Sequence, residues 1–169
     1  MRRAKLVQAF IAVGLLISTV GSCGRAESQI PGPDAPAPRS EPLARGVFPD
    51  EISGGLKIKA GEVTKSIEIE DASEVVMVKN TFAPGASGGW HSHPGSAIGV
   101  VASGEFTYVR ASDCARFTYS KGESFIDPGH GNVHIGFNAS ESEDVVLYVT
   151  FLEVPKGAAP STPAEAPDC

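Results

Sequence analysis

The amino-acid sequence predicts an all-β domain, a sandwich or small barrel built from short strands. Short runs rich in β-branched and aromatic residues recur along the chain, and turns that contain Gly or Pro separate them. No segment between residues 46 and 154 combines a long helical period with helix-capping residues. The length of 169 residues leaves room for one modest domain.

The first 22 residues are predicted to be a secretory signal peptide. A basic opening of two arginines and a lysine precedes an apolar run over residues 6–20, which is short for a membrane span. Small residues then lead to Cys23, and this junction resembles the bacterial lipobox, in which the cysteine becomes the lipidated first residue. We therefore expect an extracytoplasmic protein, either anchored to the membrane through a lipid on Cys23 or secreted after ordinary cleavage near Gly21.

Two segments of biased composition flank the predicted domain. Residues 23–45 are rich in Pro and Gly and hold few bulky apolar residues, so we expect a disordered linker there. Residues 155–169 are a second stretch of this kind, a Pro/Ala-rich C-terminal tail. The folded domain is thereby placed at residues 46–154.

The cysteine count agrees with export. Lipidation of Cys23 would leave one pair, Cys114 and Cys169, for which a disulfide is expected outside the cytoplasm, and two free thiols are the alternative. Removing the signal peptide with three of the 14 basic residues leaves 11 basic against 20 acidic residues, a formal charge of −9. This charge argues against nucleic acid or an anionic membrane surface as a partner.

Predicted strands follow one another through the domain. Apolar and polar residues alternate at 56–59 and 66–70, which is typical of half-buried strands, and a nearly continuous apolar run at 75–78 indicates a more buried one. Further β-like runs lie at 98–101, 106–109, 116–119, 124–126, 133–135 and 145–152. Closing such strands into a barrel or sandwich would also remove exposed sheet edges.

Three histidines in two clusters are the candidate metal ligands. His91 and His93 are two residues apart in an extended stretch, so their side chains face the same way, whereas Trp90 is expected to face the other way. His134 comes from a separate strand and can complete a site, because neutral imidazole is a common ligand for Zn, Fe, Cu and Ni. The fourth histidine, His130, lies in a Gly-rich turn and is expected at the surface.

These clusters resemble the two sequence motifs of the cupin superfamily, type 2. The first motif is Gly, five residues, His-x-His, three or four residues, Glu, six residues, Gly, and its matches here are Gly85, His91, His93 and Gly104. Ala97 stands where the motif has glutamate. The second motif is matched, with one extra residue between Pro128 and Gly131, by Gly122, Pro128, Gly131, His134 and Asn138.

The resemblance implies a double-stranded β-helix, the jelly-roll cupin barrel. It also implies one divalent metal ion held inside by His91, His93 and His134, with Fe, Zn, Mn, Ni and Cu left open as its identity. Many cupins pair, so a homodimer is a further expectation. Because Ala97 supplies no carboxylate, the group that balances the charge of the ion is open, and the candidates are Asp127, Glu123 and Glu105.

Three functions stay open at this point. The first is a metal-dependent enzyme of oxygenase or isomerase type that acts on a small molecule, with Asp127 or a metal-bound water as its base. The second is a non-catalytic, lipid-tethered module that binds a metal or a small ligand. The third is a barrel without metal that docks on a partner. The sequence identifies neither a substrate nor a catalytic residue.

Overall fold

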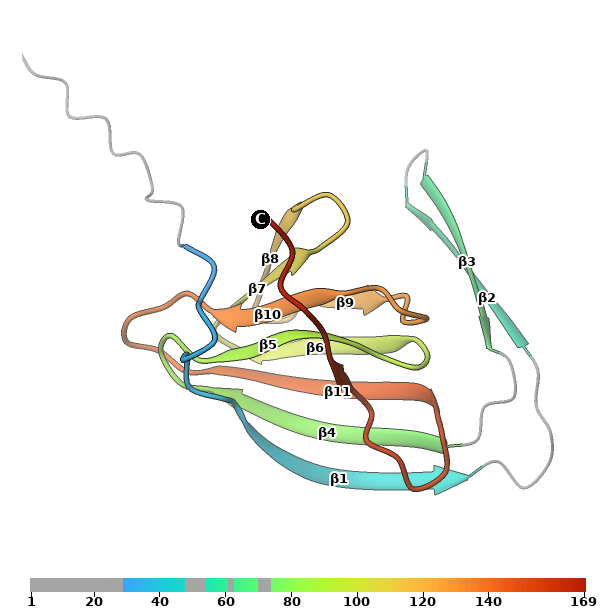
Figure 1. The fold of residues 1–169 in the computed structure, drawn as a ribbon. Helices are drawn as coiled ribbons and strands as arrows, with labels where there is room; N and C mark the ends of the chain where they lie inside the picture. The colour runs from blue at the N-terminus through green and yellow to red at the C-terminus, as the bar shows by residue number, and fades with distance from the viewer. Residues whose placement is uncertain (1–28, 48–53, 61–62, 70–73) are drawn as a thin grey trace, which may run out of the picture.

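The computed structural model describes residues 29–47, 54–60, 63–69 and 74–169, and these residues form strands and no helix (Figure 1). The predicted signal peptide and Cys23 lie outside the described residues. Within the described ranges, no helix has the length and apolarity needed to cross a membrane. The all-β prediction is confirmed.

Twelve strands are formed by the described residues. In chain order they are β1 Arg39–Val47, β2 Gly54–Ala60, β3 Val63–Ile69, β4 Glu74–Phe82, β5 Ser87–Ser92, β6 Ala97–Ser103, β7 Glu105–Arg110, β8 Arg116–Ser120, β9 Ser124–Asp127, β10 His134–Asn138, β11 Val145–Val154 and β12 Thr162–Pro163.

Ten of these strands form two five-stranded antiparallel sheets, the jelly roll that the motif resemblance implies. One sheet has the order β1-β4-β11-β6-β9 and the other β12-β5-β10-β7-β8. Strands that are neighbours in sequence therefore often lie in different sheets, as Figure 1 shows for β4 and β5. The predicted strand at 56–59 lies in β2 and the one at 66–70 lies in β3 as far as residue 69, with residue 70 outside the described residues; β2 and β3 form a separate two-stranded sheet.

The hydrophobic core takes residues from both large sheets. Its buried members come mainly from β4, β6, β7 and β11, and include Val76, Phe82, Val101, Phe106, Leu147 and Phe151. Aromatic rings fill much of this space; Phe106 stacks on Phe125 with ring centroids 5.3 Å apart. Each such side chain stabilises the fold by about 1.5–3 kcal/mol when buried, so the core holds the two sheets together.

The predicted boundary between linker and domain is wrong. Residues 39–45, assigned above to the disordered linker 23–45, form most of β1, which pairs with β4 from Arg39 opposite Thr81 to Val47 opposite Glu74. The strand is mostly exposed, so backbone pairing at the sheet edge holds it, and the burial pattern that marks a strand in a sequence is weak. An edge position also tolerates Pro42, which has no N–H to donate.

The C-terminal residues return to the domain. The two-residue strand β12 pairs with β5, and Cys169 forms a disulfide with Cys114, with the Cα atoms 5.6 Å apart. This is the pair that the cysteine count predicts. Residues 155–169 are thus tied to the sandwich along their length.

Candidate metal centre

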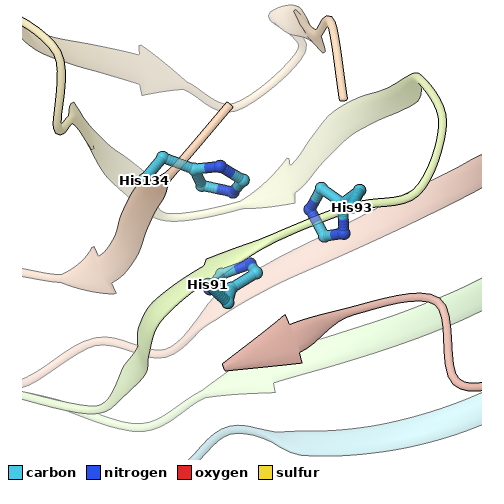
Figure 2. Close-up of side chains that lie close together, drawn as sticks. All are labelled: His91, His93 and His134. Atoms are coloured by element: carbon cyan, nitrogen blue, oxygen red, sulfur yellow. The ribbon is translucent and has the colours of Figure 1, made fainter. Parts of the chain in front are cut away.

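The three predicted ligands converge between the two sheets (Figure 2). His91 on β5 is paired directly with His134 on β10, and His93 lies one residue beyond the end of β5. The ring centroids are 4.4 Å apart for His91 and His134, 5.0 Å for His91 and His93, and 5.1 Å for His93 and His134. His93 and His134 are buried, and His91 is partly exposed.

Strand alternation accounts for this convergence. Trp90 pairs with Ile135 and packs against the small apolar cluster of Val109, Ile135 and Phe137. His91 follows Trp90 and His134 precedes Ile135, so both histidines face the opposite side, toward the core. The sequence prediction that Trp90 and His91 face opposite ways is confirmed.

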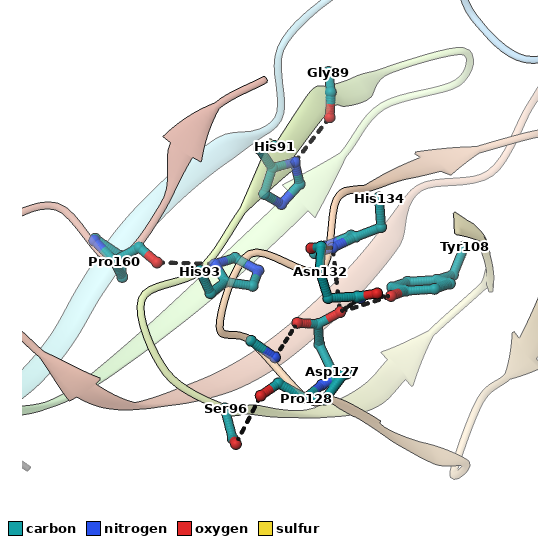
Figure 3. A network of polar contacts seen from close by, with 11 residues as sticks. Gly89, His91, His93, Ser96, Tyr108, Asp127, Pro128, Asn132, His134 and Pro160 are labelled. Atoms are coloured by element: carbon teal, nitrogen blue, oxygen red, sulfur yellow. Dashed lines mark hydrogen bonds and ion pairs between the residues drawn. The ribbon is translucent and has the colours of Figure 1, made fainter. Parts of the chain in front are cut away.

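Each imidazole has a hydrogen-bond acceptor at its Nδ1 atom (Figure 3). His91 Nδ1 lies 2.8 Å from the carbonyl oxygen of Gly89, which a β-bulge at 88–89 and a φ of +67° turn toward the ring. His93 Nδ1 lies 2.8 Å from the carbonyl oxygen of Pro160. His134 Nδ1 lies 3.3 Å from the carbonyl oxygen of Asn132 and 3.2 Å from Asp127 Oδ2.

These contacts fix the chemistry of the rings. A carbonyl or carboxylate oxygen only accepts, so a neutral ring beside it carries its proton on Nδ1 and has its lone pair on Nε2. Metal-ligating histidines are oriented in the same way, by an acceptor on the nitrogen that does not bind the metal. One ligand atom from each of the three histidines lies within 4.8 Å of the others. The three residues fit a metal ion.

Asp127 is the centre of a buried polar network next to His134 (Figure 3). Its side chain is 1% exposed. Oδ2 accepts hydrogen bonds from the Tyr108 hydroxyl and from Asn132 Nδ2, both at 2.6 Å, and Oδ1 accepts one from the Gly129 N–H at 2.8 Å. Asn132 Nδ2 also donates to the Tyr108 oxygen at 2.8 Å. The carboxylate therefore accepts three hydrogen bonds, and His134 Nδ1 lies 3.2 Å from its Oδ2 atom.

The network settles which carboxylate lies at the site. Ala97, where the cupin motif has glutamate, is on β6 and pairs directly with Asp127 on β9. The acidic group is thus one strand away from the motif position. Glu123 is exposed and accepts a hydrogen bond from the Ser120 N–H, and Glu105 is exposed. Of the three candidates, Asp127 is the one beside the histidines.

Burial lowers the pKa of all three imidazoles. Burial is the main cause for His91, with the Gly89 carbonyl opposing it. For His93, burial and then the neighbouring His91 lower the pKa. Burial, followed by the charge of His91, lowers the pKa of His134 to about 4, although Asp127 acts in the opposite direction. Burial therefore favours the neutral form of the three rings, which is the form that binds metals.

The fourth histidine, His130, and the motif residue Asn138 contact other parts of the fold. His130 is at the surface as predicted, 51% exposed, with Nε2 3.2 Å from Glu153 Oε2. Asn138 donates hydrogen bonds from Nδ2 to the carbonyl oxygens of Phe82 and Glu143 and ties the end of β10 to its neighbours.

Sequence reasoning missed three groups at the site. Tyr108 carries a buried hydroxyl for Asp127, and its ring stacks on that of His134 with centroids 4.7 Å apart. Asn132 supplies both a side-chain donor and a backbone acceptor. The third is the Pro160 carbonyl. Asn132 lies inside the second motif, which is a usable signal, but no sequence pattern connects residue 160 with residue 93.

One family model and several solved structures are similar to this chain. The family model named "Cupin domain" matches residues 79–151. A cupin-like protein from Thermotoga maritima is similar at 26% identity and a TM-score of 0.47, over 54% of this chain and 65% of the other. A cupin domain from Bordetella pertussis is similar at 17% identity and a TM-score of 0.47, over 73% of this chain and 100% of that one.

An oxalate oxidase in complex with the substrate analogue glycolate is similar at 29% identity and a TM-score of 0.41, over 48% of this chain and 43% of its own. No curated protein sequence matches the chain significantly.

Proposed function

The chain belongs to the cupin superfamily through the domain at residues 79–151, and we propose that this domain holds one divalent metal ion between His91, His93 and His134. The observation that carries the proposal is the set of Nδ1 acceptors, which leaves three Nε2 lone pairs for one ion. Neutral imidazole suits Zn, Fe, Cu and Ni, and Mn is a further candidate from the family resemblance. When bound, such an ion supplies Lewis acidity toward an oxygen ligand.

The residues around the histidines support binding in a shielded place. The carboxylate of Asp127 is buried beside the histidines and balances part of the charge of a bound cation. The rings of Tyr108 and Phe151 pack against His134 and His93 with centroids 4.7 and 4.8 Å apart. They exclude water from two sides and strengthen electrostatic interactions at the site. The partly exposed His91 marks the side that a small ligand reaches first.

A groove supports a small molecule as the partner. It has a volume of about 510 Å³, which falls in the range of small-molecule sites, and it lies between β1, β4 and the C-terminal residues. Two of its lining residues, Phe151 and Pro160, contact His93. Arg45 and Ser161 give the groove polar groups next to its apolar floor.

A non-catalytic module that binds a metal or a small ligand is the second candidate. The observation that favours it is Asp127, whose two oxygens already accept three hydrogen bonds and lie beside the His134 ring. A carboxylate engaged in this way is poorly suited to take a proton from a substrate. Enzymatic turnover would then depend on the ion and its bound ligands alone.

The proposed location is outside the cytoplasm, with the domain tethered through Cys23 or secreted. The predicted signal peptide supports it, and so does the bond between Cys114 and Cys169, because disulfides persist in oxidising compartments. Metabolic labelling with an alkyne fatty acid tests the tether: label is expected on the full-length chain and is expected to disappear in Cys23→Ser. Equal labelling of both proteins would contradict lipidation at this residue.

Elemental analysis of the full chain, purified without a histidine tag, tests the metal proposal. We expect a stoichiometric divalent ion, and its loss in His91→Ala, His93→Ala and His134→Ala. His130→Asn is the matched control, because it removes the exposed fourth imidazole from a turn with a φ of +50°, which Asn tolerates. Metal content that is equal in all five proteins, or absent from the wild type after incubation with each candidate ion, would refute the proposal.

A further inference from the structure

Residues 155–169, which we name the C-terminal strap, run back across the sandwich after β11. Figure 1 shows them passing in front of β11 and β5 and ending near the β7–β8 hairpin. None of the fifteen residues is buried. Because the strap buries so little apolar surface, its position depends on a few polar contacts and on the disulfide.

The strap contacts the metal centre directly. The carbonyl oxygen of Pro160 is the acceptor for His93 Nδ1, 67 residues away in sequence. Immediately afterwards, Thr162 pairs with Ser92 and Pro163 with His91. The Ala164 N–H then donates to the carbonyl oxygen of Trp90 at 2.9 Å. The strap thus runs beside the end of β5, where His91 lies, and contacts His93 one residue beyond it.

His93 differs from the other two histidines in the origin of its acceptor. Gly89 and Asn132, which serve His91 and His134, lie two residues before these histidines in the same strand or turn. Their positions follow from the local backbone of the motifs. The acceptor of His93 comes instead from a segment outside both motifs, so the orientation of this ring depends on how firmly that segment is held.

Anchors on both sides hold the Pro160 carbonyl. On the N-terminal side, Arg45 forms an ion pair with Glu74 and donates from Nη2 to the Ala158 carbonyl at 2.6 Å. The Gly157 N–H donates to Glu74 Oε2 at 3.0 Å. On the C-terminal side, the disulfide fixes Cys169 to Cys114 on the loop between β7 and β8.

We propose that the C-terminal strap is a positioning element of the metal centre. Its Pro160 carbonyl fixes the His93 ring with Nε2 toward the site, and Arg45 and the disulfide keep that carbonyl in place. The effect on metal affinity rests on the proposed metal function, whereas the effect on the ring does not. Loss of a partner that orients a ligand typically weakens metal binding by about 10–100-fold.

The experiment releases both anchors in the full chain by combining Cys114→Ser and Cys169→Ser with Arg45→Met. The control combines the two serine substitutions with Arg39→Met, which removes an exposed arginine from the same strand, where it pairs with Glu41. Amide hydrogen exchange at Gly157 and Ala164 reports whether the strap is released. Faster exchange at both is expected in the Arg45 protein, and unchanged exchange would refute the role of these anchors.

Ring positions are read in the metal-free proteins by 15N chemical shifts of the histidine side chains, at a pH well above the ordinary imidazole value of 6.5. In the Arg45 protein we expect the 15N chemical shifts of His93 to depart from those of the Nδ1–H form, while His91 and His134 keep the shifts of that form. Co²⁺ titration followed by visible absorption is expected to show the loss of affinity. An unchanged His93 signal with a released strap, or equal changes in all three rings, would overturn the proposal.

The two proposals fail in different ways. Failure of the wild type to bind Co²⁺ or any other candidate ion would refute the metal function, and the 15N shifts would still decide whether the strap positions His93. If the wild type binds Co²⁺ and the variant with a released strap binds it equally well, the positioning role alone would be refuted.

Discussion

Replacing Asp127 by Asn tests the buried network next to the proposed ligands with little change of shape. The carboxylate accepts three hydrogen bonds and lies beside His134 Nδ1, and an amide presents an N–H₂ group toward some of the same donors. The contact to His134 Nδ1 at 3.2 Å is the one that orients a ligand. Its loss is expected to weaken metal binding by about 10–100-fold, which is about 1.4–2.7 kcal/mol.

The assay is the stabilisation by metal of each protein against urea, which compares loaded with metal-free protein of the same variant. A change in the stability of the metal-free fold cancels in this difference, so the measurement isolates binding. At saturating metal the increment is expected to fall by about 1.4–2.7 kcal/mol in Asp127→Asn. Asp144→Asn, the same change at an exposed position, is expected to keep the wild-type increment. An increment within about 0.5 kcal/mol of wild type in Asp127→Asn would refute the role of the network.

Three further predictions concern stability. Lowering the pH of the metal-free protein is expected to leave its unfolding free energy unchanged above pH 6.5 and to reduce it toward pH 4, because the unfolded chain binds a proton at His134 at a higher pH than the folded one. The loss from this group is about 3 kcal/mol. A urea midpoint that does not change over this pH range would contradict the prediction. A methyl group at Gly136 would overlap the Phe106 ring, so Gly136→Ala is expected to lower the unfolding free energy by about 1–3 kcal/mol. Gly46 has open space around it, so Gly46→Ala is expected to have little effect. Equal unfolding free energies for the two variants would contradict this prediction. Tyr108→Phe removes a hydrogen-bond donor to the buried Asp127 and is expected to lower the unfolding free energy in urea by about 1–3 kcal/mol. Tyr148 is 43% exposed, so Tyr148→Phe is expected to have little effect. An equal loss in both variants would show that the contact of the Tyr108 hydroxyl is unimportant.

The fold and the ligand set were largely predictable because both depend on local pattern. Alternation predicts that His91 and His93 face the same way, and the direct pairing of His91 with His134 brings in the third ring. The β-rich runs correspond to strands in the structure, since apolar residues with a two-residue period bury well only in a sheet. The jelly-roll order itself came from the resemblance to a family.

The parts that were wrong or missed depend on long-range contacts. Residues 39–45 form an edge strand that backbone pairing holds, and their composition resembles that of a linker. For the carboxylate at the site the sequence left Asp127, Glu123 and Glu105 open, and the pairing of Ala97 with Asp127 selects Asp127. The Pro160 carbonyl is a backbone group, which leaves no trace in side-chain patterns.

X-ray absorption spectroscopy of the full chain loaded with its native metal is the most direct test of the proposed site. We predict scattering from three imidazole rings, with metal–nitrogen distances of about 2.0–2.1 Å if the ion is zinc, and a loss of one ring in each of His91→Ala, His93→Ala and His134→Ala. A spectrum dominated by sulfur, or one without imidazole scattering, would contradict it.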